Sequence, residues 1–460
     1  MNVSKTVTNT HAGGETPVKR LAMASAIGTI IEAYDFVLYG TVAALVFDEL
    51  FFPNADPVVG TLAAFATFGV GFLARPVGGA LFGHYGDKVG RKKMLVISLM
   101  VMGVATILIG CLPGFDSIGI LAPILLVTLR LVQGLALGGE WGGAVLMVTE
   151  YAPKGRRGFF GSWPQIGFAG GLLISTVIIA ILTGVMSDAA FASWGWRVPF
   201  FLSGVLVAVG LWVRLRIEET PAFAELQEEQ AREKMPAIEV FREHPKPMAR
   251  AIGMRLSENI TFYMLIVFGL SYGEEELGIS RTTLLVAIAV SAALSFVAVP
   301  FFGRLSDRVG RRPVFLWGAV ASVVLAVAFF PLLKTESTLV IILAFALVMN
   351  TAHDAQYAVE SSYFAEMFPT RVRYSGISIS AQLGGVLAGA FAPLIATALV
   401  AADGGGLTLM VIYFAAMCSI SAVAAFLSPE TFKRDFLGTE RRDEQRFVRD
   451  RTPDRDRVRA

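Results

Sequence analysis

Charged residues are scarce in this sequence. They make up 17% of its 460 residues, against roughly 25% in an average soluble domain, while hydrophobic residues make up 55%. So few charges cannot cover the surface of a soluble protein of this length. The composition therefore excludes an ordinary soluble domain and predicts a polytopic membrane protein.

Other residues and motifs are also rare or missing. There is no G-x-x-x-x-G-K-[ST] run that would bind nucleotide phosphates, as a primary pump requires. The residues best suited to bind metals are few and do not cluster: Cys111, Cys418, His11, His84, His244 and His353. Their spacing fits neither a disulfide framework nor a metal site. We therefore expect no enzyme activity, no cofactor, no metal and no nucleic-acid partner.

Long apolar runs are abundant instead. A membrane-spanning helix needs about 20 mostly apolar residues. Twelve such runs occur, near 21–47, 58–82, 94–112, 118–149, 159–186, 198–213, 251–270, 284–302, 314–333, 339–364, 375–400 and 407–427. The sequence thus predicts an all-α membrane protein with twelve transmembrane helices.

Basic residues between these runs are distributed unevenly. One set of connections holds Lys5, Lys19, Arg20, Lys88, Arg91, Lys92, Lys93, Lys154, Arg156, Arg157, Arg304, Arg308, Arg311, Arg312, Arg371 and Arg373. The alternate connections hold only Arg197, Arg281 and Lys334. Because positive loops stay on the cytoplasmic side, we expect both termini in the cytoplasm and a location in the bacterial cytoplasmic membrane.

Polar segments divide the chain into regions. Residues 214–250 are too polar to cross lipid and separate the twelve runs into six and six. The tail after residue 428 mixes arginine with acidic residues and lacks apolar heptads, which favours disorder. We expect a cytoplasmic segment (1–20), a six-helix bundle (21–213), a cytoplasmic linker (214–250), a second six-helix bundle (251–428) and a charged tail (429–460).

Two loop motifs recur at matching positions in the two halves. Gly83-His-Tyr-Gly-Asp-Lys-Val-Gly-Arg-Lys-Lys93 follows the second run, and Gly303-Arg-Leu-Ser-Asp-Arg-Val-Gly-Arg-Arg-Pro313 follows the eighth, 220 residues later. Glu150 and Arg157 after the fourth run match Glu366 and Arg373 after the tenth, 216 residues later. Two parallel halves are the arrangement expected of a transporter that moves one half against the other around a central site.

These motifs resemble those of the major facilitator superfamily. More narrowly, Ile31-Glu-Ala-Tyr-Asp-Phe-Val-Leu-Tyr-Gly40, Arg75-Pro-Val-Gly-Gly79, Trp196-Arg-Val-Pro-Phe200 and Asn350-Thr-Ala-His-Asp354 resemble its metabolite:proton symporter family. The resemblance covers nearly all of residues 20–428. It implies a proton-coupled carrier of a small organic acid, or of an osmolyte such as proline or betaine, and the run Ala352-His-Asp354 resembles the shikimate-type branch.

Two carboxylates interrupt the first apolar run. Ser25, Gly28, Glu32, Asp35 and Tyr39 follow one another at steps of three or four, so they fall on one stripe of a helix. An ionised carboxylate inside a membrane costs several kcal/mol unless it is paired, hydrated or protonated. Burial favours the protonated form, which is the property that a proton-coupling site requires.

Arg130, in the fourth run, is the counter-ion expected for Asp35. The resemblance supports this pairing, because a helix 1 aspartate and a helix 4 arginine occupy similar places in sugar porters. We hypothesise that Asp35 alternates between an ion pair with Arg130 and a protonated state. Glu32 and His353 are rival proton carriers, a static buried ion pair is the structural alternative, and sodium coupling stays open.

The substrate-binding candidates are polar or aromatic residues inside the apolar runs. They are Tyr34, Arg75, Arg130, Trp141, Gln165, Glu258, Asn259, Tyr263, Asp354, Tyr357 and Gln382. A guanidinium group can bind a carboxylate through two hydrogen bonds, so the arginines favour an anion. The interpretation is proton-coupled uptake of a small organic acid by a transporter acting as a monomer; the alternative is proton- or sodium-coupled uptake of a zwitterionic osmolyte.

The repeated loop motifs predict a cytoplasmic gate. Its expected members are the acidic and basic residues Asp87, Arg91, Glu150, Arg157, Asp307, Arg311, Glu366 and Arg373. Ion pairs between the halves would close one end of the molecule and break when that end opens. Topology signalling by positive charge alone is the simpler alternative, but it does not require the two repeated aspartates.

Overall fold

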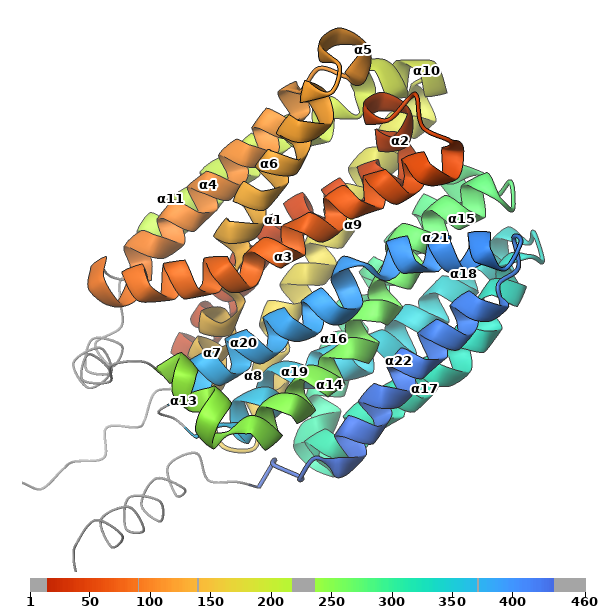
Figure 1. Ribbon diagram of the computed structural model, residues 1–460. Coiled ribbons are helices and arrows are strands. Elements are labelled where there is room, and N and C mark those ends of the chain that lie inside the picture. Colours follow the sequence, from red (N-terminus) through yellow and green to blue (C-terminus); the bar gives the residue numbers. More distant parts are fainter. Residues whose placement is uncertain (1–14, 90, 139, 217–235, 370–371, 434–460) are drawn as a thin grey trace, which may run out of the picture.

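The computed structural model describes residues 15–89, 91–138, 140–216, 236–369 and 372–433, and these residues contain helices and no strand (Figure 1). The first half contains α1 (Glu15–Leu45), α2 (Phe47–Phe51), α3 (Pro57–Val89), α4 (Arg91–Cys111), α5 (Phe115–Ile118), α6 (Leu121–Leu137), α7 (Glu140–Tyr151), α8 (Arg157–Gly161), α9 (Trp163–Val185), α10 (Asp188–Ala190), the π-helical turn η1 (Phe191–Gly195) and α11 (Arg197–Arg216).

The second half repeats this arrangement. It contains α13 (Pro236–Glu243), α14 (Pro245–Tyr263), η2 (Met264–Phe268), α15 (Gly269–Glu275), α16 (Arg281–Val309), α17 (Arg311–Leu333), α18 (Thr338–Leu347), η3 (Val348–His353), α19 (Asp354–Met367), α20 (Arg373–Gly385), η5 (Val386–Ala390), α21 (Ala392–Ala402) and α22 (Thr408–Leu427). The π-helical turns η2, η3 and η5 interrupt three spans beside the polar residues described below.

The helices occupy the twelve predicted runs. Among the described residues, ten helices are long and apolar enough to cross a membrane. The segments Asp188–Gly195 and Arg197–Trp212, bent by 46°, form an eleventh candidate, and Val96–Cys111 is a shorter apolar helix in the place of the third run. Large apolar side chains such as Val297 (72% exposed) and Ile181 (58% exposed) point outward, as expected for surfaces that face lipid.

The two halves meet through equivalent pairs of helices. In the first half α3 packs against η5 and α21, and α9 packs against α16 of the second half. If the spans are numbered 1 to 12, these pairs are span 2 with span 11 and span 5 with span 8. Span 2 is equivalent to span 8, and span 5 is equivalent to span 11, so the two contacts are the same contact seen from each half. The sequence repeat is therefore also a repeat of the contacts, with a central region between the halves.

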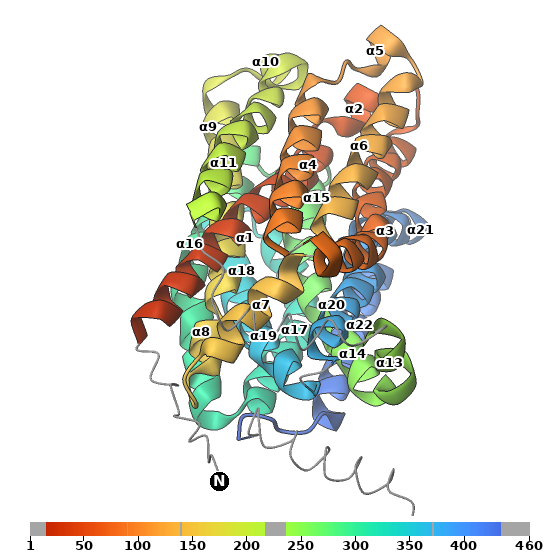
Figure 2. The same ribbon diagram turned by 90° about the vertical axis from the view of Figure 1, so that its left-hand side faces the viewer.

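The two ends of the bundle are distinguished by their loops. The start of α1, the segments α8 and α13, and the end of α22 lie at one end, which we name the terminal face (Figure 2). The short helices α5 and α10 lie at the other end, the opposite face (Figures 1 and 2). The predicted gate residues belong to the terminal face.

Helices of the first half approach one another closely where glycine removes a side chain. A Cβ atom added to Gly134 of α6 would overlap the carbonyl oxygen of Gly71 on α3, and one at Gly138 would overlap the carbonyl oxygen of Arg75. Small residues at steps of four allow such backbone contact between membrane helices. This packing fixes Arg75 on α3 and Arg130 on α6 in neighbouring helices.

Candidate functional site

Asp35 is buried in the centre of the first half. Its side chain is 1% exposed and accepts hydrogen bonds from Thr106 Oγ1 on α4 (2.9 Å) and Ser203 Oγ on α11 (2.5 Å). Both donors are fully buried hydroxyl groups. Since a hydroxyl group can either donate or accept, this pocket suits both the ionised and the protonated carboxyl group. Sequence analysis missed Thr106 and Ser203.

Arg130 is connected to Asp35 indirectly in this conformation. Its Nη1 donates to Gln133 Oε1 (3.0 Å), and Gln133 Nε2 donates to Thr106 Oγ1 (2.7 Å), the same hydroxyl group that donates to Asp35. The direct ion pair expected from the sequence is absent among the described residues. The arginine and the carboxylate instead belong to one chain of hydrogen bonds.

The remaining surface of Arg130 faces aromatic rings. Its guanidinium carbon lies 3.9 Å from the ring centre of Tyr39 and 4.9 Å from that of Phe36. The Nε and Nη2 atoms are buried without a hydrogen-bond partner. A buried unpaired donor on a cation is costly, so these two groups are the ones on Arg130 that could still donate a hydrogen bond.

Arg75 has similar surroundings. Its guanidinium carbon lies 4.2 Å from the ring centres of both Phe36 and Phe72, and its buried Nε also lacks a partner. Tyr263, from α14 of the second half, packs edge-on against Phe36 and Phe72. Two arginines thus lie beside one aromatic cluster where the halves meet. Glu32 is half-buried one turn before Asp35 on α1.

A second polar network occupies the centre of the second half. His353 Nδ1 lies 3.0 Å from Asp354 Oδ1, and His353 Nε2 lies 3.3 Å from Glu258 Oε1. Asn259 donates to Glu258 Oε2 (2.8 Å), and Asn350 donates to Asp354 Oδ2 (2.9 Å). The predicted residues Glu258, Asn259, His353 and Asp354 are therefore brought together on α14, η3 and α19.

Arg255 completes this network. It forms an ion pair with Glu258 (3.3 Å) and a hydrogen-bonded ion pair with the fully buried Glu360. Its guanidinium carbon lies 5.1 Å from the ring centre of Trp141, which belongs to α7 of the first half. Arg255 was missed, although an arginine inside an apolar run was a signal that could have found it.

The five remaining substrate-binding candidates lie at other places. Tyr34 is fully buried in the first half and donates to the carbonyl oxygen of Pro199 (2.7 Å), away from the central cluster. Gln165 on α9 accepts from Trp141 (3.3 Å) and donates to the carbonyl oxygen of Tyr357 in the second half (3.0 Å). Gln382 on α20 donates to the carbonyl oxygen of Gly138 (3.3 Å). Trp141, Gln165, Tyr357 and Gln382 therefore connect the two halves.

Asp307 joins the halves at the terminal face. Its carboxylate accepts hydrogen bonds from the backbone N–H groups of Gly158 and Phe159 on α8, each at 2.8 Å, and pairs with Arg311 (2.7 Å). Arg311 also pairs with Glu366 (3.2 Å). Three predicted gate residues therefore form one buried network, whose link to the first half runs through backbone groups.

A second connection between the halves lies nearby. Arg373 Nη1 of α20 pairs with Glu150 Oε1 of α7 at 3.1 Å, as an ion pair between the predicted gate residues. Ser361 donates to the carbonyl oxygen of Gly161 (2.6 Å). Arg157 is buried at the start of α8. The side chains of Asp87 and Arg91 lie outside the described part of the structure.

Comparisons with known proteins agree with this architecture. A family model described as "Sugar (and other) transporter" matches residues 21–235 and again residues 223–442. The structure of the xylose transporter XylE from E. coli, in a partially occluded inward open conformation, superposes with a TM-score of 0.71 at 16% identity, covering 91% of this chain and 100% of that one. These matches establish the twelve-helix fold of two six-helix bundles.

Curated relatives are much more similar in sequence. A shikimate transporter of Escherichia coli (strain K12) is 44% identical over 415 residues, which cover 90% of this chain and 95% of the relative. A proline/betaine transporter of the same organism is 36% identical over 431 residues, covering 92% and 85%. These relatives are transporters and not enzymes. The chain therefore belongs to the major facilitator superfamily, in its metabolite:proton symporter family, and is a multi-pass membrane transporter of a small molecule.

Proposed function

We propose that this protein takes up a small organic acid together with protons. The observation that carries the proposal is the pair Arg75 and Arg130, two central guanidinium groups that contact aromatic rings and form no ion pair with the described residues. A carboxylate placed between them would supply the missing acceptors for their N–H groups. The flat rings of Phe36, Phe72 and Tyr263 suit an unsaturated or aromatic carbon skeleton.

Asp35 is the proposed proton carrier. When it is ionised, the relay through Thr106 and Gln133 holds Arg130 in the orientation described above. Protonation removes the negative charge of Asp35 from this relay, so the guanidinium of Arg130 can form an ion pair with the substrate carboxylate instead. Substrate and proton then bind together, as symport requires, since each reduces the electrostatic cost of the other. Glu32 is retained as a rival carrier, one turn away.

The second half would recognise the polar groups of the substrate. Asn259 and Tyr263 lie beside Gly389 of η5, where a Cβ atom would stand 2.8 Å from the ring of Tyr263 and 3.0 Å from Asn259 Oδ1. His353 lies between Glu258 and Asp354, with one ring nitrogen facing each carboxylate. This network supplies hydrogen bonds to hydroxyl groups and is a second place where a proton can be stored. The similarity to a shikimate transporter supports a hydroxylated acid.

Uptake of a zwitterionic osmolyte is the second candidate function. It is favoured by the proline/betaine transporter that matches over 92% of this chain. An ammonium group would be placed near Glu258 and Asp354, and the carboxylate near Arg75. The carboxylates of the second half already pair with Arg255 and His353, however, so the unpaired groups at the centre are cationic. The geometry therefore favours an anion.

Orientation and gating follow from the terminal face. We propose that this face is cytoplasmic, because the basic loops predicted to stay inside belong to it. The networks of Asp307 and Arg373 then close the cytoplasmic end in this conformation. They would break when the site opens to the cytoplasm of a bacterium. We propose that one chain carries out the whole cycle, since the central site is built from the two halves of a single chain.

Transport by liposomes tests the proposal. Purified protein is reconstituted, an acid-outside pH gradient is imposed without sodium, and uptake of labelled shikimate, 2-oxoglutarate, citrate, benzoate and glycine betaine is recorded in parallel. We expect accumulation of at least one acid, its collapse with a protonophore, and its loss in Asp35→Asn. Asp56→Asn, which removes a carboxylate from an exposed loop, is the matched control and should transport normally.

The outcomes separate the hypotheses. Accumulation of glycine betaine alone would establish the osmolyte function and reject the organic acid. Uptake that requires sodium would reject proton coupling. If Asp35→Asn still concentrates an acid under the pH gradient alone, Asp35 is not the proton carrier, and Glu32→Gln and His353→Asn become the variants to compare.

A further inference from the structure

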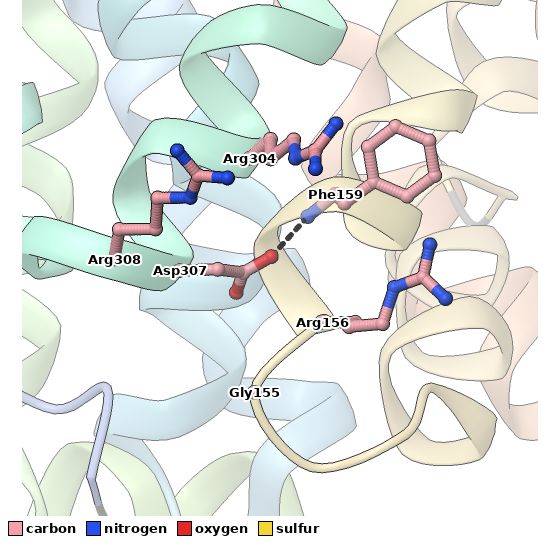
Figure 3. Close-up of a pocket in the computed structure, with 6 residues that line it drawn as sticks. All are labelled: Gly155, Arg156, Phe159, Arg304, Asp307 and Arg308. Carbon is pink, nitrogen blue, oxygen red and sulfur yellow. Dashed lines mark hydrogen bonds between the residues drawn. The ribbon is translucent and has the colours of Figure 1, made fainter.

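A cavity lined by arginine lies at the terminal face, between α8 of the first half and α16 of the second (Figure 3). Its volume is about 350 Å³, and it is lined by Gly155, Arg156, Phe159, Arg304, Asp307 and Arg308. Small-molecule sites begin at roughly this size. We name this cavity the α8–α16 groove. It is separate from the central site, and the transport mechanism above makes no use of its three arginines.

The lining of the groove is strongly cationic. Its lining contains three arginines and one aspartate, a net charge of +2. The carboxylate of Asp307 does not neutralise these arginines, because it accepts hydrogen bonds from Gly158 N and Phe159 N and pairs with Arg311. Arg304 and Arg308 form no hydrogen bond or ion pair with any residue that the structure describes. The groove therefore attracts an anion rather than a metal or an amine.

The position of the two arginines indicates which anion. Val290, Leu294, Val297, Phe301, Arg304 and Arg308 follow one another along α16 at steps of three or four. They form one stripe of the helix, and its apolar members are exposed, Val297 at 72% and Phe301 at 57%. On a membrane-spanning helix such an exposed apolar stripe faces lipid chains. Arg304 and Arg308 come where this apolar stripe ends, which is where a spanning helix is expected to reach the lipid headgroups.

We propose that the α8–α16 groove binds the phosphate of an anionic phospholipid. The headgroup lies among Arg156, Arg304 and Arg308, and an acyl chain follows Phe301 and Val297 along α16. Basic pockets between transmembrane helices on the cytoplasmic side are known to bind such headgroups. Because Arg156 belongs to the first half and Arg304 and Arg308 to the second, the bound phosphate bridges the halves and stabilises the closed terminal face.

Native mass spectrometry of the full-length protein in detergent tests this proposal. Phosphatidylglycerol, phosphatidylethanolamine and inorganic phosphate are titrated in separate experiments. We expect one phosphatidylglycerol molecule to bind more tightly than the others. The double variant Arg304→Gln/Arg308→Gln should weaken it about 30-fold, from roughly 5-fold per arginine near a membrane surface. Both side chains are exposed, so the variant should fold.

A matched control removes two basic residues outside the groove. Arg242→Gln/Lys246→Gln loses the same charge from exposed positions of the terminal face and should bind phosphatidylglycerol like the parent protein. Equal weakening in both double variants would overturn the proposal in favour of nonspecific surface charge. Equal affinity for inorganic phosphate would show a soluble-anion site, and equal affinity for phosphatidylethanolamine would show that net lipid charge is not recognised. Either result, or unchanged binding in the Arg304/Arg308 variant, would overturn the lipid site.

Discussion

Replacing Asp307 by asparagine should open the terminal face. In the structure this carboxylate accepts from two backbone N–H groups of the other half, Gly158 N and Phe159 N, and from Arg311. Asparagine has one carbonyl oxygen in place of two carboxylate oxygens. One of the two backbone N–H groups therefore loses its acceptor, and the other keeps an acceptor that is no longer charged. A hydrogen bond to a charged group contributes about 1.5–3 kcal/mol. Arg311 retains Glu366 as a partner.

The expected shift is therefore about 2–3 kcal/mol, which changes the ratio of closed to open molecules about 30- to 150-fold. It can be measured as the distance between spin labels at Met23→Cys and Phe241→Cys, two exposed positions on the two halves, after Cys111 and Cys418 are replaced by serine. Asp307→Asn should add a population with a longer distance between the labels.

Asp403→Asn is the control for this measurement. Asp403 accepts from Thr408 N (2.9 Å) near the end of α21, within the second half, so its loss should leave the label distance unchanged. If Asp307→Asn gives the same distance distribution as the parent protein, the hydrogen bonds to α8 do not hold the halves together. The reasoning on the gate would then be wrong.

Three further predictions concern other contacts. Arg130→Gln should weaken binding of the proposed anionic substrate by at least tenfold in an equilibrium binding assay, because it removes a hydrogen-bonded charge; an unchanged Kd would place the anion elsewhere. Gly134→Leu should lower the free energy of unfolding by about 1–3 kcal/mol or more, and lower the Tm, because the new side chain overlaps α3. Gly184→Leu is the control, since no atom lies within 4 Å of its Cβ position, and it should leave the Tm unchanged. Equal Tm values for the two variants would contradict the close packing. Glu150→Gln should shift the label distance less than Asp307→Asn, because the ion pair with Arg373 includes a carboxylate that is 28% exposed.

The architecture was largely predictable from the sequence. Apolar runs of membrane-spanning length and the repeat at 220 residues predicted twelve helices in two halves, because lipid requires every span to satisfy its own backbone. Motif resemblance correctly predicted the family. The repeated positions of Glu150 and Arg373 predicted both as gate residues, but the sequence did not pair them with each other, as the structure does.

The connections of the buried charges were not predictable. Thr106 and Ser203 are ordinary hydroxyl residues within apolar helices, and nothing in their spacing shows that they meet at Asp35. Arg130 bonds Gln133, its neighbour at i+3 on α6, and this contact depends on a side-chain conformation that a sequence pattern does not show. Asp307 binds backbone groups of α8, which have no sequence signature.

The arrangement of these contacts also limits how a proton on Asp35 can affect the second half. Both hydroxyl donors to Asp35 belong to the first half, on α4 and α11. Its relay ends at Arg130, whose ring partners Phe36 and Phe68 pack against Tyr263 of α14. The aromatic cluster is thus one route from the carboxylate to the other half.

This route predicts a measurable energetic coupling between Asp35 and Tyr263. Tyr263→Leu removes the edge-on ring contacts from the second half, and Asp35→Asn mimics the neutral, protonated form of Asp35. If protonation reaches the second half through Arg130 and this ring, the effects of the two substitutions on substrate Kd will be non-additive, by roughly 0.5–3 kcal/mol for residues in one network. Tyr413→Leu, a half-buried tyrosine on α22, provides the comparison and should be additive with Asp35→Asn. Additive effects for Tyr263 as well would mean that the proton and the second half communicate through a different set of contacts.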